Sequence, residues 1–399
     1  MKTHILTDNI DIAVDIIKKG GLVAVPTETV YGIACNGLDE RAVDRIYELK
    51  GRPEVKPLSL MVKGPSAIDS CATAPPIQAY SLAKRFWPGP LTIVLNANLE
   101  IPENVRASGK TVGLRCPAHE KTLSLLEKSD LPLAAPSANP SGKESPVSAE
   151  QVKDYFDGKI DAIIDGGICS LGVESTVISL AETPFRIIRQ GAVSEREIAE
   201  ALMSEIKIIG VTGGSGVGKS TALSVMESTG ALCIDCDAVY HELLNSDLSL
   251  QSELKEHFSD AFESGNLSRK KLGSIVFNNP EELKKLNKIA HPHISSSVMG
   301  IIREHAMNGG TLAVIDASEL IESDLAGRCT KIISVISEPQ NRIMRIMARD
   351  NISEEYAKER ILAQKPDSYY AENSDLCLSN DGSKEEFEAK CLSIIMEVK

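Results

Sequence analysis

The most specific chemical signal in this sequence is a glycine-rich run in its second half. The run fits the pattern G-x-x-x-x-G-K-[ST] in full, and it consists of Gly213, Gly214, Ser215, Gly216, Val217, Gly218, Lys219 and Ser220, with Thr221 directly after it. A strand is expected over 208–211 and a helix over 221–228, which is the context that this motif needs. Backbone N–H groups can then face phosphate oxygens, while Lys219 reaches the β- and γ-phosphates and Ser220 ligates Mg²⁺. A glycine-rich turn that merely caps a helix is the weaker alternative, so this half is predicted to bind a nucleoside triphosphate.

Two carboxylates follow the next expected strand, over 231–234. Asp235 and Asp237 come at its carboxyl end, where α/β sheets bind ligands. Asp237 could accept a proton from an acceptor hydroxyl, or either carboxylate could hold Mg²⁺. The alternative is a polar strand end that caps a helix starting near Ala238. Cys233 and Cys236 form a single C-x-x-C without a second pair, so neither zinc nor redox chemistry is expected there.

Three arginines further along have helical spacing. Arg342, Arg345 and Arg349 recur at i, i+3 and i+7, which places them on one side of a helix. In a phosphoryl-transfer enzyme they suit a lid that closes on ATP and stabilises charge in the transition state. A solvated helix face is the alternative. The pair His291 and His293 is too short a pattern for a metal site, and we interpret it as structural or substrate-positioning.

The first half has no such loop, but polar and basic clusters recur where its expected strands end. Each cluster alone is compatible with a turn. Lys50 alone is compatible with a residue that stabilises a helix dipole, because it lies in the last turn of a helix that Gly51 and Pro53 end. The clusters are 26–32, 50–53, 87–92, 113–115, 135–139, 172–176 and 189–191. Together they bring several basic groups and hydroxyls onto loops. They predict a cavity that binds an anion and a small polar ligand.

The elements that must position these residues alternate between helix and strand, which indicates an α/β protein. Of the 399 residues, 42% are hydrophobic and 25% charged, which is ordinary for a globular chain of two or three domains. Ser194 and Glu197 have capping-box spacing for a helix to about Met203. A strand over 207–211 then opens what reads as a new nucleotide-binding domain. The predicted domains are 1–205 and 206–399.

Charge and cysteine usage narrow the class of protein. The net charge of −13, with a pI near 5.2, argues against a chain that coats nucleic acid by bulk charge, although a local basic cavity is compatible with it. No apolar run approaches the roughly 18 residues of a membrane span, and residues 1–11 lack the apolar stretch of a signal peptide. The nine cysteines are scattered and odd in number. We therefore expect reduced thiols, a cytoplasmic location and no membrane association.

Essentially all of 206–399 resembles the dephospho-coenzyme A kinases. The matching stretches are Val211-Thr212 with the glycine-rich loop, 234–237, Arg269 with 276–279, 287–292, 345–350 and 380–383. The resemblance implies a P-loop kinase domain with a parallel sheet, a helical substrate region and a lid, which transfers the γ-phosphate of ATP to the ribose 3′-hydroxyl of dephospho-coenzyme A. It implies that Asp237 is the base, with Lys219, Arg345 and Arg349 also catalytic. Two positions depart from the family: Ser318-Glu319-Leu320 stands where Pro-Leu-Leu is usual, and Arg342 replaces a lid glutamine.

Residues 10–192 resemble the YrdC/TsaC family, the threonylcarbamoyl-AMP synthases. The segments PTETVYG, KGRP, WPGPLT, GLRCP, PSAN, GVESTV and RQG all stand in family order. The resemblance implies a twisted α/β sheet with a concave cavity, where L-threonine, bicarbonate and ATP give threonylcarbamoyl-AMP and pyrophosphate. The nucleotide contacts it implies are Lys50, Arg52, Ser137 and Asn139, with Lys56, Thr111, Ser145 and Arg189 in addition. The threonine contacts it implies are Thr29, Arg115 and Ser175.

The sequence therefore predicts a bifunctional ATP-dependent transferase. Mg²⁺ is the expected cofactor, with no tightly bound organic cofactor and no zinc. The expected partners are the substrates and the tRNA-modification proteins that use threonylcarbamoyl-AMP, and a weak tRNA contact is compatible with this prediction. Two alternatives remain. The first half could be a nucleotide- or RNA-binding module that regulates a kinase, or the second half could act on another acceptor.

Overall fold

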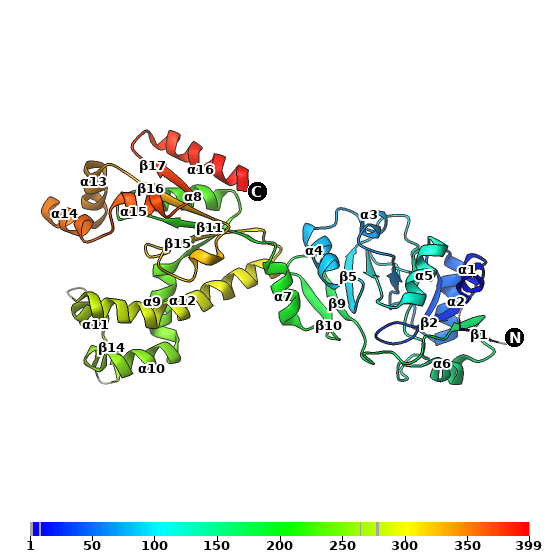
Figure 1. Cartoon of the computed structure of the whole chain (residues 1–399). Helices are drawn as coiled ribbons and strands as arrows, with labels where there is room; N and C mark the ends of the chain where they lie inside the picture. Colours follow the sequence, from blue (N-terminus) through cyan, green and yellow to red (C-terminus); the bar gives the residue numbers. More distant parts are fainter. Residues whose placement is uncertain (1–2, 8, 264, 277–278, 399) are drawn as a thin grey trace. The chain divides into compact units, whose positions relative to one another are not determined.

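The computed structural model describes residues 3–7, 9–263, 265–276 and 279–398. Phe277 and Asn278, part of one of the matching stretches, lie outside the described residues. The chain divides into two compact units (Figure 1). The first comprises Met1–Glu205 with Met307–Gly309, and the second comprises Ile206–Ala306 with Gly310–Lys399. The α/β class predicted from the sequence is confirmed in both.

The first unit is built on one mixed ten-stranded sheet, with the order β1-β8-β2-β3-β7-β4-β6-β5-β9-β10. The strands are β1 (His4–Leu6), β2 (Val23–Val25), β3 (Gly32–Asn36), β4 (Ser59–Met61), β5 (Leu91–Asn96), β6 (Thr111–Arg115), β7 (Leu133–Ala134), β8 (Ala162–Ile164), β9 (Thr176–Ser179) and β10 (Arg186–Arg189). The sheet contains both parallel and antiparallel pairs: β4 is parallel to β6, β6 antiparallel to β5, and β5 parallel to β9. Most strands are short, so long loops leave the sheet where the predicted site residues lie.

Helices cover this sheet in the described part of the first unit. They are α1 (Ile10–Lys18), α2 (Glu40–Lys50), α3 (Ala67–Cys71), α4 (Ile77–Phe86), α5 (Glu120–Ser129), α6 (Ala149–Phe156) and α7 (Glu195–Met203). Gly51 ends α2 in the left-handed conformation, with φ 56°. Ser194 and Glu197 form the predicted capping box of α7. A core of apolar side chains from α1, α5 and strands β2, β3, β7 and β8 includes Ile17, Val23 and Leu125, all fully buried.

The second unit has a five-stranded sheet with the order β12-β15-β11-β16-β17, parallel at every pairing. Its strands are β11 (Lys207–Thr212), β12 (Leu232–Asp235), β15 (Leu312–Asp316), β16 (Lys331–Ile336) and β17 (Leu376–Ser379). A small hairpin of β13 (Phe262–Glu263) and β14 (Asn266–Leu267) stands apart from it. The predicted parallel sheet is confirmed, with β11 at its centre.

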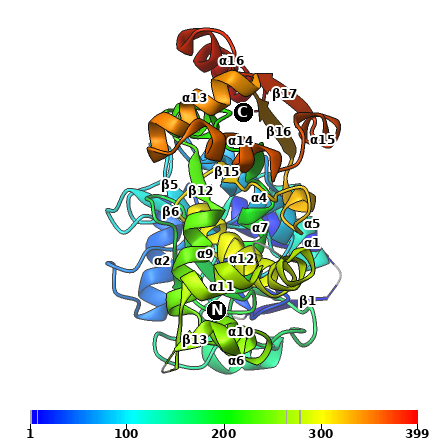
Figure 2. The same ribbon diagram turned by 90° about the vertical axis from the view of Figure 1, so that its left-hand side faces the viewer.

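The helices of the second unit fall into three groups (Figure 1). The helices next to the sheet are α8 (Lys219–Ser228) and α16 (Lys384–Val398). The helices that gather at one end with the hairpin, seen again in Figure 2, are α9 (Cys236–Ser246), α10 (Leu248–His257), α11 (Arg269–Val276) and α12 (Pro280–Met307). The helices after β16 are α13 (Pro339–Asp350), α14 (Glu354–Leu362) and α15 (Asp367–Glu372). Short 3₁₀ turns occupy Ser259–Ala261 and Ala326–Arg328.

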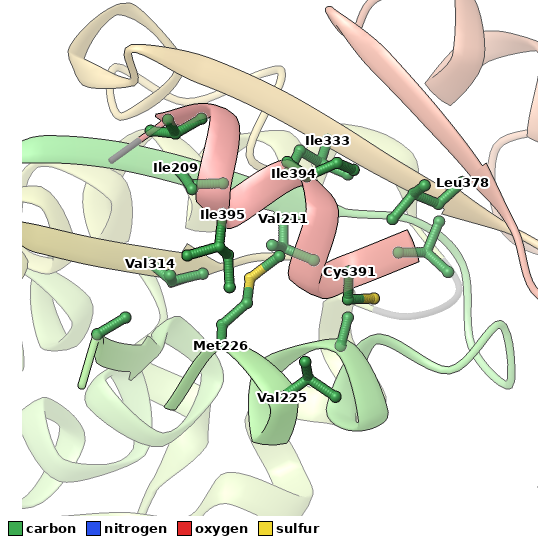
Figure 3. Close-up of a cluster of buried hydrophobic side chains, with 14 of the residues drawn as sticks. Ile209, Val211, Val225, Met226, Val314, Ile333, Leu378, Cys391, Ile394 and Ile395 are labelled. Carbon is green, nitrogen blue, oxygen red and sulfur yellow. The ribbon is translucent and has the colours of Figure 1, made fainter. Parts of the chain in front are cut away.

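The core of the second unit lies between the sheet and the helices α8 and α16 (Figure 3). Cys391, Ile394 and Ile395 of α16 lie on the strand residues Val211 and Val314. Burial of these side chains fixes β11 at the centre of the sheet, because each fully buried aliphatic side chain contributes about 1.5–3 kcal/mol. The loop that leaves β11 therefore starts from a rigid point.

Candidate functional site

The glycine-rich loop of the second unit joins the central strand β11 to α8. Gly213 has φ 138° and Gly218 has φ 104°, a region that favours glycine. A Cβ atom on Gly213 would collide with the carbonyl oxygen of Val335. Lys219 donates from Nζ to the Gly213 carbonyl at 3.0 Å, so its charge lies over the loop. The predicted strand, loop and helix are present, in an arrangement suited to holding phosphates.

Arg342 and Arg345 of α13 bind carbonyl groups of this loop. Arg342 donates from Nε to the Ser215 carbonyl at 3.0 Å, and its Nη1 pairs with Asp367 at 2.8 Å. Arg345 donates from Nη1 to the carbonyls of Gly216 (3.2 Å) and Val217 (3.3 Å). In a P-loop the N–H groups face the phosphates, so an arginine bound to loop carbonyls braces the loop. The lid role of Arg345 stays a prediction.

Arg349 does not contact the loop, whereas Gln364 does. Arg349 is largely exposed and pairs with Asp350 at 2.7 Å rather than with the loop, so the structure does not bring all three arginines together. Gln364, after α14, accepts from the Ser215 N–H at 2.8 Å and donates to Ser215 Oγ at 2.9 Å. Sequence reasoning missed Gln364, because nothing local distinguishes it from other polar helix-end residues.

Three carboxylates lie at the carboxyl ends of β12 and β15. Asp235 caps α9, since its Oδ1 accepts from the N–H groups of Asp237 (2.9 Å) and Ala238 (3.1 Å). Burial and the nearby Asp235 raise the pKa of Asp237 above its usual range. Burial raises the pKa of Asp316 to about 6, against the opposing effect of Lys219. Sequence reasoning missed Asp316, which an apolar strand ending in Asp beside a P-loop strand could have indicated.

A cavity of about 280 Å³ adjoins these carboxylates, between α9, α11, α12 and the segment after β15. Asp237 lines it, as do Asn287 and His291. The hydroxyl oxygens of Tyr240 and Ser295, also on this wall, are out of contact with solvent and have no hydrogen-bond partner among the described residues. The cavity can therefore take a ligand with an apolar face and a few polar groups.

The two histidines of the His291-Pro292-His293 stretch separate. His291 faces the cavity, where its Nε2 lies 3.4 Å from Glu319. His293 lies against α10, with Nδ1 2.8 Å from Asp247 and Nε2 3.2 Å from Glu253. The structural interpretation fits His293, and the substrate-positioning interpretation suits only His291.

In the first unit a cavity of about 190 Å³ collects five of the predicted residues from separate loops. They are Arg52, Arg115, Ser137, Ser175 and Arg189. Arg115, at the end of β6, is buried and its Nη2 pairs with Glu28 at 2.7 Å. Burial lowers the pKa of this guanidinium, and Glu28 opposes the effect. Nη1 of Arg115 has no hydrogen bond to any described residue, and it is the atom suited to a carboxylate ligand.

Thr29 and Ser175 lie beside these cations. The Thr29 hydroxyl accepts from Arg115 Nη2 at 2.8 Å. The Ser175 hydroxyl contacts that of Thr92 at 2.9 Å and accepts from Arg189 Nη2 at 3.1 Å. The three residues predicted to hold a small polar ligand therefore fall into two hydrogen-bonded pairs, Thr29 with Arg115 and Ser175 with Arg189, and Thr29 does not itself line the cavity.

Arg189 is held by an acidic residue on the rim. Glu174 pairs with Arg189 and also accepts from the Ser145 hydroxyl at 3.0 Å. Ser145 lines a neighbouring cavity of about 520 Å³, and Glu174 lines both cavities. Sequence reasoning missed the partners Glu28 and Glu174, although each is the single acid of a loop otherwise rich in Thr, Ser and Gly.

Lys50 lies beneath the cavity wall. Its ammonium group is buried and donates to the carbonyls of Ser137 and Asn139, and burial lowers its pKa to about 8. Asn139 is buried as well, and its Nδ2 donates to the Lys143 carbonyl at 2.6 Å. Both residues therefore hold the 135–143 loop in shape around Ser137.

Two further predicted contacts are not brought to this cavity. Thr111 begins β6 and Arg115 ends it, which separates them by roughly 13 Å along the strand. The Lys56 side chain is exposed, and the Lys56 carbonyl accepts from Arg52 Nε at 3.1 Å. We leave Thr111 and Lys56 out of the proposed site.

The matches to known proteins follow the same division. Residues 15–191 match the Sua5/YciO/YrdC family, described as "Telomere recombination", and residues 207–386 match the CoaE family, described as dephospho-CoA kinase. A threonylcarbamoyl-AMP synthase of Pyrococcus abyssi is 48% identical over 213 residues, which is 53% of this chain and 62% of that relative. A relative from Methanocaldococcus jannaschii, named "Putative threonylcarbamoyl-AMP synthase", is 35% identical over 46% of this chain and 86% of the length of that relative. A dephospho-CoA kinase of Geobacillus kaustophilus is 32% identical over 47% of this chain and 95% of its own. The chain belongs to both families.

The chain spans only part of the length of the first relatives that it matches. It spans only 62%, 57% and 49% of three threonylcarbamoyl-AMP synthases, those of Pyrococcus abyssi, Bacillus subtilis and Schizosaccharomyces pombe. The kinase match begins at residue 207, shortly after the Sua5/YrdC match ends at 191.

The donor set of the kinase unit fits Mg²⁺. Asp316 Oδ1 is buried without a hydrogen-bond partner among the described residues, and Ser220 stands in the first turn of α8. Mg²⁺ commonly binds through one or two protein oxygens together with substrate phosphates and water. In the part of the chain that the structure describes, no group of three or more His, Cys, Asp or Glu side chains is arranged to hold a metal. Nor does any described helix have the length and apolarity to cross a membrane.

Proposed function

We propose that this chain carries out two ATP-dependent reactions. Its first unit forms threonylcarbamoyl-AMP from L-threonine, bicarbonate and ATP, and its second unit phosphorylates the ribose 3′-hydroxyl of dephospho-coenzyme A. The observation that carries the proposal is that each unit matches a family relative over 86% or more of that relative's length, with a cavity that holds the predicted polar residues.

In the kinase reaction the 3′-hydroxyl oxygen attacks the γ-phosphorus, the bond from that phosphorus to the β-phosphate oxygen breaks, and ADP leaves. The loop 213–218 and Lys219 hold the phosphates, and Asp237 takes the hydroxyl proton. A raised pKa suits Asp237 for this task, because a base works best when its pKa lies nearer the working pH. Arg342, Arg345 and Gln364 keep the loop in the binding shape.

Mg²⁺ would be held by Asp316 and Ser220 together with ATP phosphate oxygens. When bound it offsets the negative charge of the phosphates. Asp316 suits this role, because its Oδ1 has no hydrogen-bond partner among the described residues, and Lys219 lowers its pKa against the larger effect of burial.

In the synthase reaction the threonine nitrogen first combines with bicarbonate and loses water, which gives a carbamate. A carbamate oxygen then attacks the α-phosphorus of ATP, and pyrophosphate leaves. Arg115, Thr29 and Ser175 would hold threonine, with Arg115 Nη1 on its carboxylate. Arg52 and Arg189, with Ser137, would bind the nucleotide and spread the charge of the departing pyrophosphate. Catalysis would then rest mainly on positioning and electrostatics.

The proposal also indicates where threonylcarbamoyl-AMP would be used and in which compartment the protein would work. Threonylcarbamoyl-AMP would pass to proteins that modify the adenosine beside the anticodon of certain tRNAs. All nine cysteines are free thiols, which supports work in a reducing compartment.

Two assays on the full chain test the proposal. Coenzyme A formation from dephospho-coenzyme A and ATP should be abolished in Lys219→Ala, and threonine-dependent pyrophosphate release should be abolished in Arg52→Ala. Each variant should keep the other activity. Threonine-independent ATP binding without pyrophosphate release would instead favour a regulatory first unit. ATP binding without coenzyme A formation would favour another acceptor for the second.

A further inference from the structure

The acceptor cavity of the second unit contains a carboxylate that the kinase chemistry described above does not use. Glu319 follows β15 and lines the cavity together with Asp237. Its side chain is 48% exposed. Its neighbour Leu320 is fully buried, so the backbone here is fixed while the carboxylate remains open to the cavity.

Two side chains of α12 hold Glu319 by one oxygen. Asn287 donates from Nδ2 to Oε2 at 2.7 Å, and Nε2 of His291 lies 3.4 Å from the same oxygen. Asn287 and His291 are four residues apart on one helix, so both reach the carboxylate from one face. Oε1 makes no hydrogen bond to any described residue. The carboxylate is therefore oriented, with one acceptor atom still available.

The rest of the wall indicates what this oxygen would meet. Leu283, Leu286, Ala290 and Ile294 of α12 form an apolar surface that suits the flat face of a nucleoside base. The hydroxyl oxygens of Tyr240 and Ser295 on the same wall have no hydrogen-bond partner among the described residues, so they can bond to polar groups of a ligand. A carboxylate repels phosphate groups and accepts hydrogen bonds, so this point favours a hydrogen-bond donor, and the amino and hydroxyl donors of a nucleoside are neutral.

We propose that Glu319 determines acceptor specificity by accepting, through Oε1, a hydrogen bond from a donor group on the nucleoside of the acceptor. The donor is either the exocyclic amino group of the base or the ribose 2′-hydroxyl beside the reacting 3′-hydroxyl. The inference rests on the proposed kinase function of this unit.

The geometry supplies two informative variants. In Glu319→Gln the side-chain oxygen keeps the bond from Asn287, so the NH₂ group takes the place of Oε1 and turns an acceptor into a donor. The side chain of Glu319→Leu has neither a hydrogen-bond acceptor nor a donor. Both variants remove the same charge, so the difference between them isolates the hydrogen bond. Asp324→Asn is the matched control, because Asp324 is an exposed carboxylate of the same segment outside the cavity wall.

The experiment measures kcat/KM of the full chain and these variants for dephospho-coenzyme A and two analogues. One analogue has hypoxanthine in place of adenine and so carries an oxygen where the amino group was, and the other lacks the 2′-hydroxyl. The wild type and Asp324→Asn should discriminate against one analogue by about 10- to 100-fold. Glu319→Leu should lose that discrimination.

The pattern in Glu319→Gln identifies the donor. A preference reversed toward hypoxanthine assigns the base amino group. Retained discrimination against the 2′-deoxy analogue assigns the ribose hydroxyl, which can also accept. Discrimination that is unchanged in Glu319→Leu, or absent from the wild type, overturns the inference. If the wild type does not phosphorylate dephospho-coenzyme A at all, the proposed function fails instead.

Discussion

In the second unit the groups that face phosphate belong to one continuous loop, whereas in the first unit they come from loops far apart in the sequence. The loop 213–218 offers backbone N–H groups and needs glycines at particular φ angles. The first cavity offers the arginines 52, 115 and 189, and two of these are paired with acids of the same unit. Both arrangements are suited to anions, but they depend on different residues.

The two sites are therefore sensitive to different changes. The backbone site depends on the shape of its loop and on one charged side chain, Lys219. A side-chain site keeps its shape through ion pairs, so removing an acid from it disturbs the cation that remains.

The largest effect is expected for Lys219→Ala, because Lys219 is the charged side chain over the P-loop. Coenzyme A formation should fall by about 1,000-fold or more in kcat. Threonine-dependent pyrophosphate release, measured on the same preparation, should stay within twofold. A parallel fall in both would show that the two sites are not independent.

Asp316→Asn should come next. Removal of the buried carboxylate should lower kinase kcat by about 100-fold and raise the Mg²⁺ concentration needed for half activity. A Mg²⁺ titration of the variant beside Asp324→Asn checks this. An unchanged Mg²⁺ requirement would remove Asp316 from the proposed metal site.

Glu28→Gln should destabilise the first unit. It leaves Arg115 buried without its charge partner, which costs about 3 kcal/mol. Hydrogen exchange of β5 and β6 in the full chain should rise accordingly, while β11 and β16 stay unchanged. The double variant Glu28→Gln/Arg115→Met should recover part of the loss. No recovery would mean that Glu28 acts through its bond from the Ala118 N–H instead.

Glu174→Gln should have a small effect of the opposite sign. The pair of Glu174 with Arg189 is partly exposed, so loss of its charge should strengthen ATP binding in the first unit by about two- to threefold. The KM for ATP in threonine-dependent pyrophosphate release, measured on the full chain, reports this site. Weaker binding would show that Glu174 is needed to aim Arg189.

The smallest effect concerns pH. Asp237 must be ionised to accept a proton, so the kinase rate should rise as pH rises through its raised pKa. The negative charge of Glu319 contributes to that raised pKa. Glu319→Gln should therefore move the midpoint of the pH–kcat profile to lower pH, whereas Asp324→Asn should leave it in place.

The sequence was most informative where one local pattern is sufficient. The P-loop, the capping box of α7 and the left-handed end of α2 each depend on a few neighbouring residues, and all three were predicted. Arg342 shows the limit. Its helix was predicted correctly, but its contacts involve Ser215 and Asp367, which no local spacing relates to it.

The sequence also did not predict contacts between residues of distant segments. Arg115 was predicted as a site residue, but its pairing with Glu28 joins segments 87 positions apart. Thr111 belongs to the same strand as Arg115, and only the direction of β6 reveals that it lies at the opposite end. Asp316 was within reach, since a buried strand that ends in a carboxylate is a local signal.

The brace behind the P-loop has a consequence for the thermodynamics of ATP binding. Fixing one residue of backbone costs about 1–2 kcal/mol of conformational entropy. The side chains of Arg342, Arg345 and Gln364 bind backbone N–H and carbonyl groups of the loop residues 215–217. The entropic cost of ordering this backbone is therefore met when the chain folds, before ATP binds. Loosening α13 should therefore weaken ATP binding through entropy, with the phosphate contacts themselves intact.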